Sequence, residues 1–170
     1  MVALNLCPFA KRELVKQRVR FVETPAATQA ELLEALKAEL ARLDADDSIE
    51  TTLLIHPQVL TDFAQYNDFL AEADALLFDL GLEGVYQVAS FHPDYQFGGT
   101  EPHDAENYTN RSPFPMLHVL REDSLTVAID NYPEVDDIPQ RNIDLMNEMG
   151  VEKLRTLLAA CFSKKPHPEG

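Results

Sequence analysis

Apolar segments in this chain follow an alternating order of short and long runs, and this order limits the folds that it can adopt. Residues 18–23, 51–55 and 85–90 are short runs with the composition of strands. Residues 28–43 open with a capping box and carry leucines at helical spacing, and residues 61–80, with Thr61 as the expected N-cap, carry a second apolar stripe. Strand, helix, strand, helix, strand is typical of parallel strands joined by right-handed crossovers. The sequence therefore predicts an α/β fold.

The second half of the chain is expected to complete the sheet and to add helices. Residues 116–121 favour a fourth strand, because Asp123 and Ser124 resemble the N-cap of a following helix; the alternative is that 116–121 open a helix. Apolar residues on both sides of Gly150 predict two closing helices. We expect a three- to four-stranded, mostly parallel sheet with a βαβαβ core, helices packed on it and a C-terminal helical segment. Residues 1–163 form a single domain in this prediction, and residues 164–170 a disordered tail.

The charge of the chain argues against several classes of partner. The formal net charge is −15 at pH 7, whereas nucleic acids and anionic membranes are bound by clustered Lys and Arg. No run approaches the roughly 18 apolar residues of a membrane span, and no apolar segment follows a basic one at the start as in a secretory signal. We expect a cytoplasmic protein without nucleic-acid or membrane partners. The cofactor and the oligomeric state stay open.

The cysteines are Cys7 and Cys161. They lie far apart and lack the spacing of a zinc site, so we expect two free thiols. Cys7 precedes an expected helix start, and Lys11 follows one turn later, which would favour the thiolate and make Cys7 a candidate nucleophile. The alternative is that Cys7 is buried as a small apolar residue.

Two of the predicted strands end in the same dipeptide, His-Pro, at His56 and at His92. The carboxyl ends of parallel strands meet at one edge of a sheet, where open α/β sheets bind their ligands. Both imidazoles are therefore candidates for acid–base catalysis, with Asp94 placed to orient His92. The alternative is that His-Pro merely ends each strand, with the ring hydrogen-bonded to the backbone.

A third imidazole, His118, opens a metal-binding alternative. His56, His92 and His118 could together hold a divalent cation with an open coordination position. No compact ligand motif such as HExxH accompanies them. Our prediction is that a metal is absent or weakly held, and that these histidines are the ligands if one is bound.

Polar and aromatic side chains concentrate in the long loop after the third predicted strand. The candidates for contact with a ligand are Tyr95, Asn107, Tyr108, Asn110, Arg111 and Ser112. Arg111 is an isolated cation, because no Lys or Arg lies between it and Arg42, and a guanidinium beside amides suits a carboxylate or phosphoryl group. We expect Arg111 to project into the same cleft as His92 and to contact a bound anion or a buried carboxylate. The alternative is that the Asn and Ser side chains only build turns.

Five segments carry a resemblance to a known family. They read LNLCPFA at 4–10, TTLLIHP at 51–57, YNDFL at 66–70, QVASFHPDYQF at 87–97 and NYTNRSP at 107–113. Over most of its length the chain resembles the bacterial DUF1415 family, a domain of unknown function. The resemblance implies no activity, cofactor or catalytic residue. Family members usually carry a helix before the Asn-Leu-Cys-Pro segment, so this chain is expected to start later than they do.

The features together favour a small enzyme that acts on a small anionic metabolite by histidine acid–base chemistry. A metal-binding or redox protein using the three histidines is the first alternative. The second is a non-enzymatic module whose aromatic loop docks a partner protein. The substrate and the reaction stay open.

Overall fold

The computed structural model describes residues 2–162, which form one four-stranded sheet and its flanking helices. The strands are β1 (Val19–Glu23), β2 (Thr51–Ile55), β3 (Tyr86–Phe91) and β4 (Met116–Arg121). The α-helices are α1 (Ala10–Val15), α2 (Gln29–Ala45), α3 (Phe63–Asp79), α4 (Glu122–Asp130), α5 (Ile138–Met149) and α6 (Val151–Ala160). Short 3-10 helices are η1 (Val2–Leu4), η2 (Ala105–Thr109) and η3 (Val135–Asp137). The expected tail at 164–170 lies outside the described residues.

The α/β class is confirmed, but the sheet is mixed, so a mostly parallel sheet is not confirmed. The strand order is β1-β2-β4-β3, and only the β1–β2 pairing is parallel. β4 lies between β2 and β3 and runs antiparallel to both, so β1, β2 and β3 still point in one direction. The long connection after β3 reverses the chain, which lets β4 pair against β3 from the opposite direction.

Of the three N-caps expected from the sequence, one is confirmed and two are wrong. Thr28 caps α2 in a capping box with Glu31, as expected. Asp62 caps α3 by accepting a hydrogen bond from the Gln65 N–H, so the expectation of Thr61 is wrong by one residue. The N-cap expected at Asp123 or Ser124 is wrong too, because α4 continues directly from β4.

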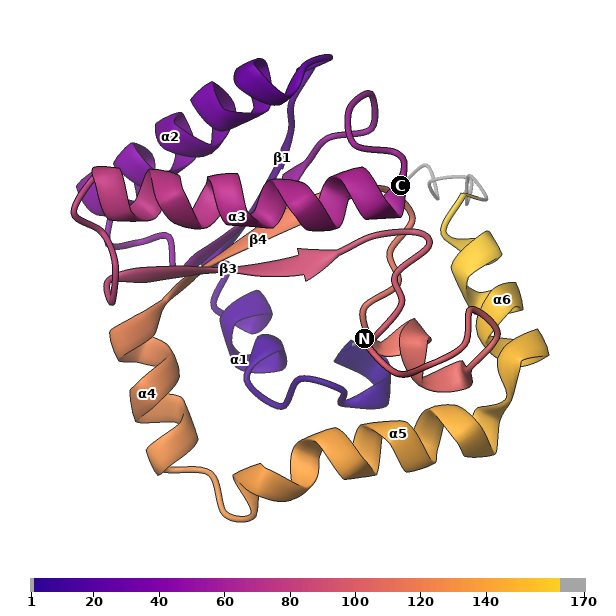
Figure 1. The fold of residues 1–170 in the computed structure, drawn as a ribbon. Coiled ribbons are helices and arrows are strands. Elements are labelled where there is room, and N and C mark those ends of the chain that lie inside the picture. The colour runs from indigo at the N-terminus through magenta and orange to yellow at the C-terminus, as the bar shows by residue number, and fades with distance from the viewer. Residues whose placement is uncertain (1, 163–170) are drawn as a thin grey trace, which may run out of the picture.

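The main core lies between the sheet and the two helices that cover one of its faces, α2 and α3 (Figure 1). Its fully buried members include Leu32, Leu36, Leu40 and Leu43 of α2, Tyr66 of α3, and Leu54, Leu117 and Val119 of the sheet. Leu54 and Leu117 are paired across β2 and β4. Alternate strand residues thus point into this layer, as the pleat requires.

The opposite face of the sheet is flanked by α1, α4, α5 and α6 (Figure 1). A second, smaller core forms away from the sheet, from Leu6, Ala105, Met146 and Leu154. The Asn142 side chain fastens the N-terminal segment to α5 by donating to the Leu6 carbonyl at 2.8 Å. None of the helices over residues 2–162 has the length and apolar character of a membrane span.

Candidate functional site

The two His-Pro histidines lie at the same edge of the sheet, one after β2 and one after β3, and both pack against α3. The ring centroids of His56 and His92 lie 5.8 Å and 5.1 Å from that of Tyr66. Tyr66 itself joins two strands, because its hydroxyl donates to the Met116 carbonyl at 2.8 Å and accepts from the Phe91 N–H at 3.0 Å. Both histidines are fully buried, so their rings belong to the interior of the molecule.

The hydrogen bonds assign a tautomer to each neutral ring. His56 Nδ1 lies 2.9 Å from the Val59 carbonyl oxygen and must donate to it, which leaves Nε2 as a buried acceptor without a partner among the described residues. His92 Nδ1 accepts from the Asp94 N–H at 3.0 Å, so Nε2 carries the proton and donates to the Leu60 carbonyl at 3.2 Å. Burial lowers the pKa of His56 to about 4 and also lowers the pKa of His92. Asp94 thus meets His92 through its backbone, while its side chain is exposed.

The two imidazoles hold the segment between β2 and α3 in place. Their acceptors, the carbonyls of Val59 and Leu60, are neighbours in the chain. Leu60 has a φ of 56°, in the left-handed region that non-glycine residues seldom adopt, and it is buried. Hydrogen bonds from two buried rings offset this strain. Both rings are therefore bonded to the backbone, as in the alternative interpretation of the His-Pro pairs.

Asn107 is fully buried and organises the loop after β3. Its side-chain oxygen accepts from the Phe97 N–H at 3.0 Å and from the Thr100 hydroxyl at 2.8 Å, and its amide donates to the Glu101 carbonyl at 2.8 Å. Thr100 N–H also bonds to the Phe97 carbonyl, with Gly99 at a φ of 84° between them. These contacts fix a glycine turn at 97–100 of the kind that needs a positive φ at its third residue.

Arg111 braces the same loop and contacts no carboxylate among the described ion pairs. Its guanidinium donates to the carbonyls of Tyr95 at 3.2 Å and Pro102 at 2.8 Å, and it lies 4.5 Å from the centre of the Tyr108 ring. The expected buried carboxylate is therefore absent from its described contacts. Carbonyl oxygens and an aromatic face take its place.

Asn110 and Ser112 also bond within the loop and strand. Asn110 donates to the Ser90 carbonyl at 3.1 Å, and Ser112 donates to the Phe114 carbonyl at 2.6 Å. Their backbones flank His92: the His92 N–H bonds to the Asn110 carbonyl and the Ser112 N–H to the His92 carbonyl. The loop is therefore shaped by the polar groups of four predicted site residues: Asn107, Asn110, Arg111 and Ser112.

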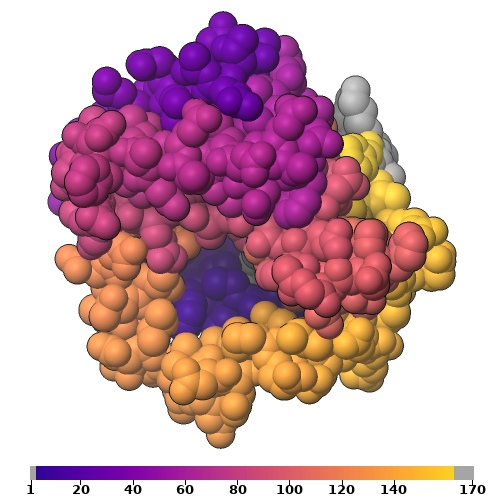
Figure 2. Space-filling view, in the orientation of Figure 1, coloured from indigo at the N-terminus to yellow at the C-terminus, as the bar shows by residue number. Residues whose placement is uncertain are grey.

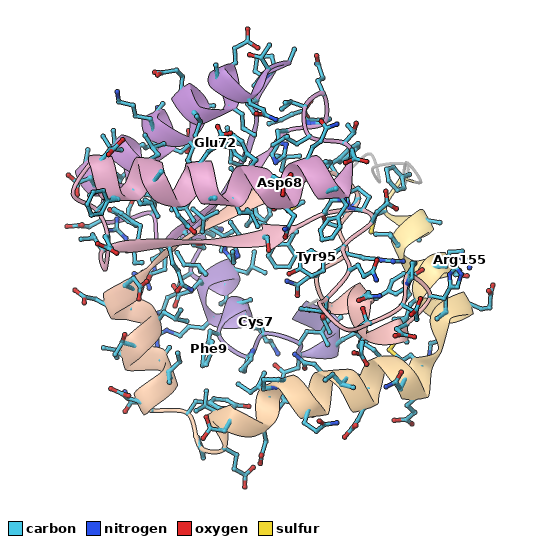
Figure 3. The ribbon with its side chains drawn as sticks, in the orientation of Figure 1. Cys7, Phe9, Asp68, Glu72, Tyr95 and Arg155 are labelled. Atoms are coloured by element: carbon cyan, nitrogen blue, oxygen red, sulfur yellow. The ribbon has the colours of Figure 1, made fainter. Side chains whose placement is uncertain are left out.

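The loop and the start of α3 line an open cleft of about 480 Å³, which we call the edge cleft. It is lined by Phe63, Ala64, Asn67 and Asp68 of α3 and by Gln96, Phe97, Gly98 and Gly99 of the loop. The Phe63 ring packs on Tyr95 at 5.2 Å and on His92 at 5.4 Å. Figure 3 shows Asp68 on α3 and Tyr95 on the loop that follows β3. The edge cleft thus lies at the carboxyl edge of the sheet, beside the expected residues.

His118 lies on the other face of the sheet from His56 and His92. It pairs with Leu53 and Ala89 across neighbouring strands, whereas the core residues Leu117 and Val119 on either side of it point towards α2 and α3. The three histidines therefore do not converge. Within residues 2–162, no group of three His, Cys, Asp or Glu side chains has the geometry to hold a metal ion.

None of the eight residues that line the edge cleft was predicted as a site residue, although Gln96, Phe97, Gly98 and Gly99 lie in the loop that the sequence singled out. The glycine pair was visible, but a glycine pair without a phosphate-binding motif predicts only a turn. Asn67 and Asp68 lie on the exposed side of an amphipathic helix, where polar residues are ordinary. The candidate nucleophile Cys7 is half-buried and lies just before α1, away from this cleft (Figure 3).

Comparison with known proteins identifies the family but no characterised relative. No curated protein and no solved structure matches the chain. Residues 1–156 match the family described as "Protein of unknown function (DUF1415)". The match covers far more than half of the chain, and the chain therefore belongs to the DUF1415 family.

Proposed function

We propose that the protein binds a small organic molecule in the edge cleft, and that this ligand combines a flat apolar part with at least one N–H or O–H donor. The supporting observation is the lining: Phe63 and Phe97 offer aromatic surface, while Asn67, Asp68 and Gln96 offer oxygen acceptors. A volume of about 480 Å³ lies within the usual range of small-molecule sites.

The charges around the edge cleft favour a cationic or neutral ligand over the anionic metabolite suggested by the sequence. Its lining contains the carboxylate of Asp68 and no Lys or Arg among the described residues. The donors of Arg111 are directed at the carbonyls of Tyr95 and Pro102. An ammonium group on the ligand would meet Asp68 and an aromatic face, both of which attract cations.

Acid–base catalysis by His56 and His92 remains a second hypothesis, supported by one observation: His56 Nε2 is a buried acceptor without a described partner. Phe63 lines the edge cleft and also packs on His92, which is itself fully buried. A substrate in the cleft would reach the His92 imidazole only after the Phe63 ring turned aside. Binding without such a movement is therefore the function that the geometry supports best.

A matched pair of ligands and a matched pair of variants test this proposal. Tyramine and 4-hydroxyphenylacetate share a phenol ring and differ in carrying an amine or a carboxylate. Tyramine is expected to raise the melting temperature of the protein in a saturable manner, since ligands that bind the native state stabilise it. Asp68→Asn is expected to weaken tyramine binding about fivefold, because an exposed ion pair contributes about 1 kcal/mol at most.

Glu72→Gln is the control, because Glu72 is an exposed carboxylate on the next turn of α3 and lies outside the cleft lining (Figure 3). It removes the same charge and should leave tyramine affinity unchanged. An equal loss in both variants would show only a long-range effect of net charge. Tighter binding of 4-hydroxyphenylacetate than of tyramine would refute the proposed ligand class.

A further inference from the structure

The face of the sheet opposite α2 and α3 is only partly covered. The helices on that side bury little: α1 and α4 have no buried residue, and α5 and α6 have one each, Met146 and Leu154. Figure 2 shows a hollow below α3 and β3, with N-terminal residues in indigo at its floor and α4 and α5 along its rim. We call it the sheet hollow. It is separate from the edge cleft, which lies at the α3 side of the sheet.

The strands present an apolar surface on this side, with one imidazole in the middle. The pairing register aligns Phe21, Leu53, His118 and Ala89 in one row across the four strands. Leu53, His118 and Ala89 are half-buried, and Phe21 is 61% exposed. The neighbouring row contains Ile55, Met116 and Phe91, all half-buried as well, and ends on β1 in the exposed Glu23. The centre of the Phe91 ring lies 5.9 Å from that of the His118 ring. An apolar strand face normally packs against another layer, so space remains here for an apolar occupant.

The hydrogen bonds of His118 define what its ring can offer. The Thr51 hydroxyl lies 2.6 Å from the Val119 carbonyl and 2.7 Å from His118 Nε2. The hydroxyl has one proton, which it donates to the carbonyl, so Nε2 must carry a proton and donate to the hydroxyl oxygen. Nδ1 is then a lone-pair acceptor, and the hydrogen bond described for this ring is the one at Nε2. Burial lowers the pKa of His118 to about 4, so the ring stays neutral near pH 7.

We propose that the sheet hollow is a second ligand site, which binds a compact, uncharged aromatic or aliphatic molecule through one hydroxyl or N–H group that donates to Nδ1 of His118. The apolar side chains of the His118 row, Leu53 and Ala89, and those of the neighbouring row, Ile55, Met116 and Phe91, would contact the body of the molecule. A carboxylate or phosphate would place its own lone pairs against that of Nδ1, so anions are excluded. α4 and α5 form part of the rim of the sheet hollow (Figure 2).

Phenol, anisole and benzoate are suitable probes, because they share a ring and differ in offering a donor, no donor or a negative charge. Phenol is expected to bind at least fivefold more tightly than anisole, and benzoate not to bind. In protein labelled with ¹⁵N-histidine, phenol should move the Nδ1 signal of His118 upfield, the direction for a lone pair that accepts a hydrogen bond. His118→Phe should bring the phenol and anisole affinities together, since Thr51 keeps its bond to Val119.

The Gly98→Val variant distinguishes phenol binding in the sheet hollow from phenol binding in the edge cleft. A Cβ at Gly98 would project into open space, so the substitution narrows the edge cleft and leaves the sheet hollow intact. Phenol binding should survive it. The proposal is overturned if Gly98→Val abolishes phenol binding, if phenol binds without moving the His118 signal, if anisole binds as tightly, or if no probe saturates. If His118→Phe fails to fold, the His118 Nδ1 signal of the labelled wild-type protein still tests the proposal.

Discussion

Lowering the pH from about 7 to about 4.5 is expected to reduce the free energy of unfolding by about 2.5 kcal/mol through His56 alone. Burial lowers the pKa of His56 from 6.5 to about 4 in the folded protein. The unfolded chain takes up a proton as the pH falls through about 6.5, whereas the folded protein excludes it until about pH 4. The stabilisation is therefore complete above about pH 7 and is lost on acidification. Urea unfolding at both pH values measures the total change, to which His92 and His118 contribute in the same direction, because burial lowers the pKa of both.

A pair of substitutions assigns this loss to His56. His56→Phe keeps a ring beside Tyr66 and removes the titrating group. The variant should be less stable near pH 7, because the Val59 carbonyl loses its donor, yet it should lose less stability on acidification. His103→Phe is the control, because His103 is exposed. A His56→Phe protein with the full pH dependence of the parent would contradict the assignment.

Replacing Asn107 by Leu is expected to lower the free energy of unfolding by about 2 to 5 kcal/mol. The substitution keeps a side chain of similar size in a fully buried position, but it leaves the Phe97 N–H and the Glu101 carbonyl without their partners. It also releases the turn at 97–100 that forms one wall of the edge cleft. Tyramine affinity should therefore fall together with stability, as measured by urea unfolding and by thermal shift.

Asn110→Leu is a graded control for this prediction. The Asn110 side chain makes one described hydrogen bond, to the Ser90 carbonyl, and none to the glycine turn. We expect it to cost about 1 kcal/mol and to leave tyramine affinity unchanged. If Asn107→Leu destabilises the protein no more than Asn110→Leu does, Asn107 does not organise the loop as described.

Local pattern was enough to predict the approximate positions of the strands and the capping box of α2, because period and capping are properties of neighbouring residues. The residues of β2 and the box between Thr28 and Glu31 were both visible in this way. The insertion of β4 between β2 and β3 could not be predicted from local pattern, because strand order depends on which distant segments pair. The choice of Asp62 over Thr61 as N-cap depends on one backbone torsion, which propensity alone does not resolve.

The sequence located the region of the candidate site better than the contacts within it. The shared direction of β2 and β3 does bring His56 and His92 to one edge. A proline after each histidine restrains its backbone but does not set the side-chain torsion, so the sequence left open whether the rings face a ligand or the carbonyls of Val59 and Leu60. Their bonds to these carbonyls needed the structure.

Sequence does not show which backbone groups a side chain contacts, and this also explains why we expected an anion beside Arg111. A cation far from any other cation in the sequence suggests an anion as its partner. The long loop, however, has carbonyl groups that need donors once it is compact. Arg111 supplies them at Tyr95 and Pro102. Sequence shows which donors a loop contains, but the acceptors appear only when the backbone path is known.

The most direct test of ligand binding at the edge cleft is a titration of ¹⁵N-labelled protein with tyramine, followed by NMR. The account predicts saturable shifts of the Gly98 and Gly99 amide signals and of the Asn67 side-chain amide, all of which line the cleft. Signals of α6, such as that of Arg155, should stay in place (Figure 3). Saturable binding that leaves Gly98, Gly99 and Asn67 unmoved, or no binding of any aromatic amine, would contradict it.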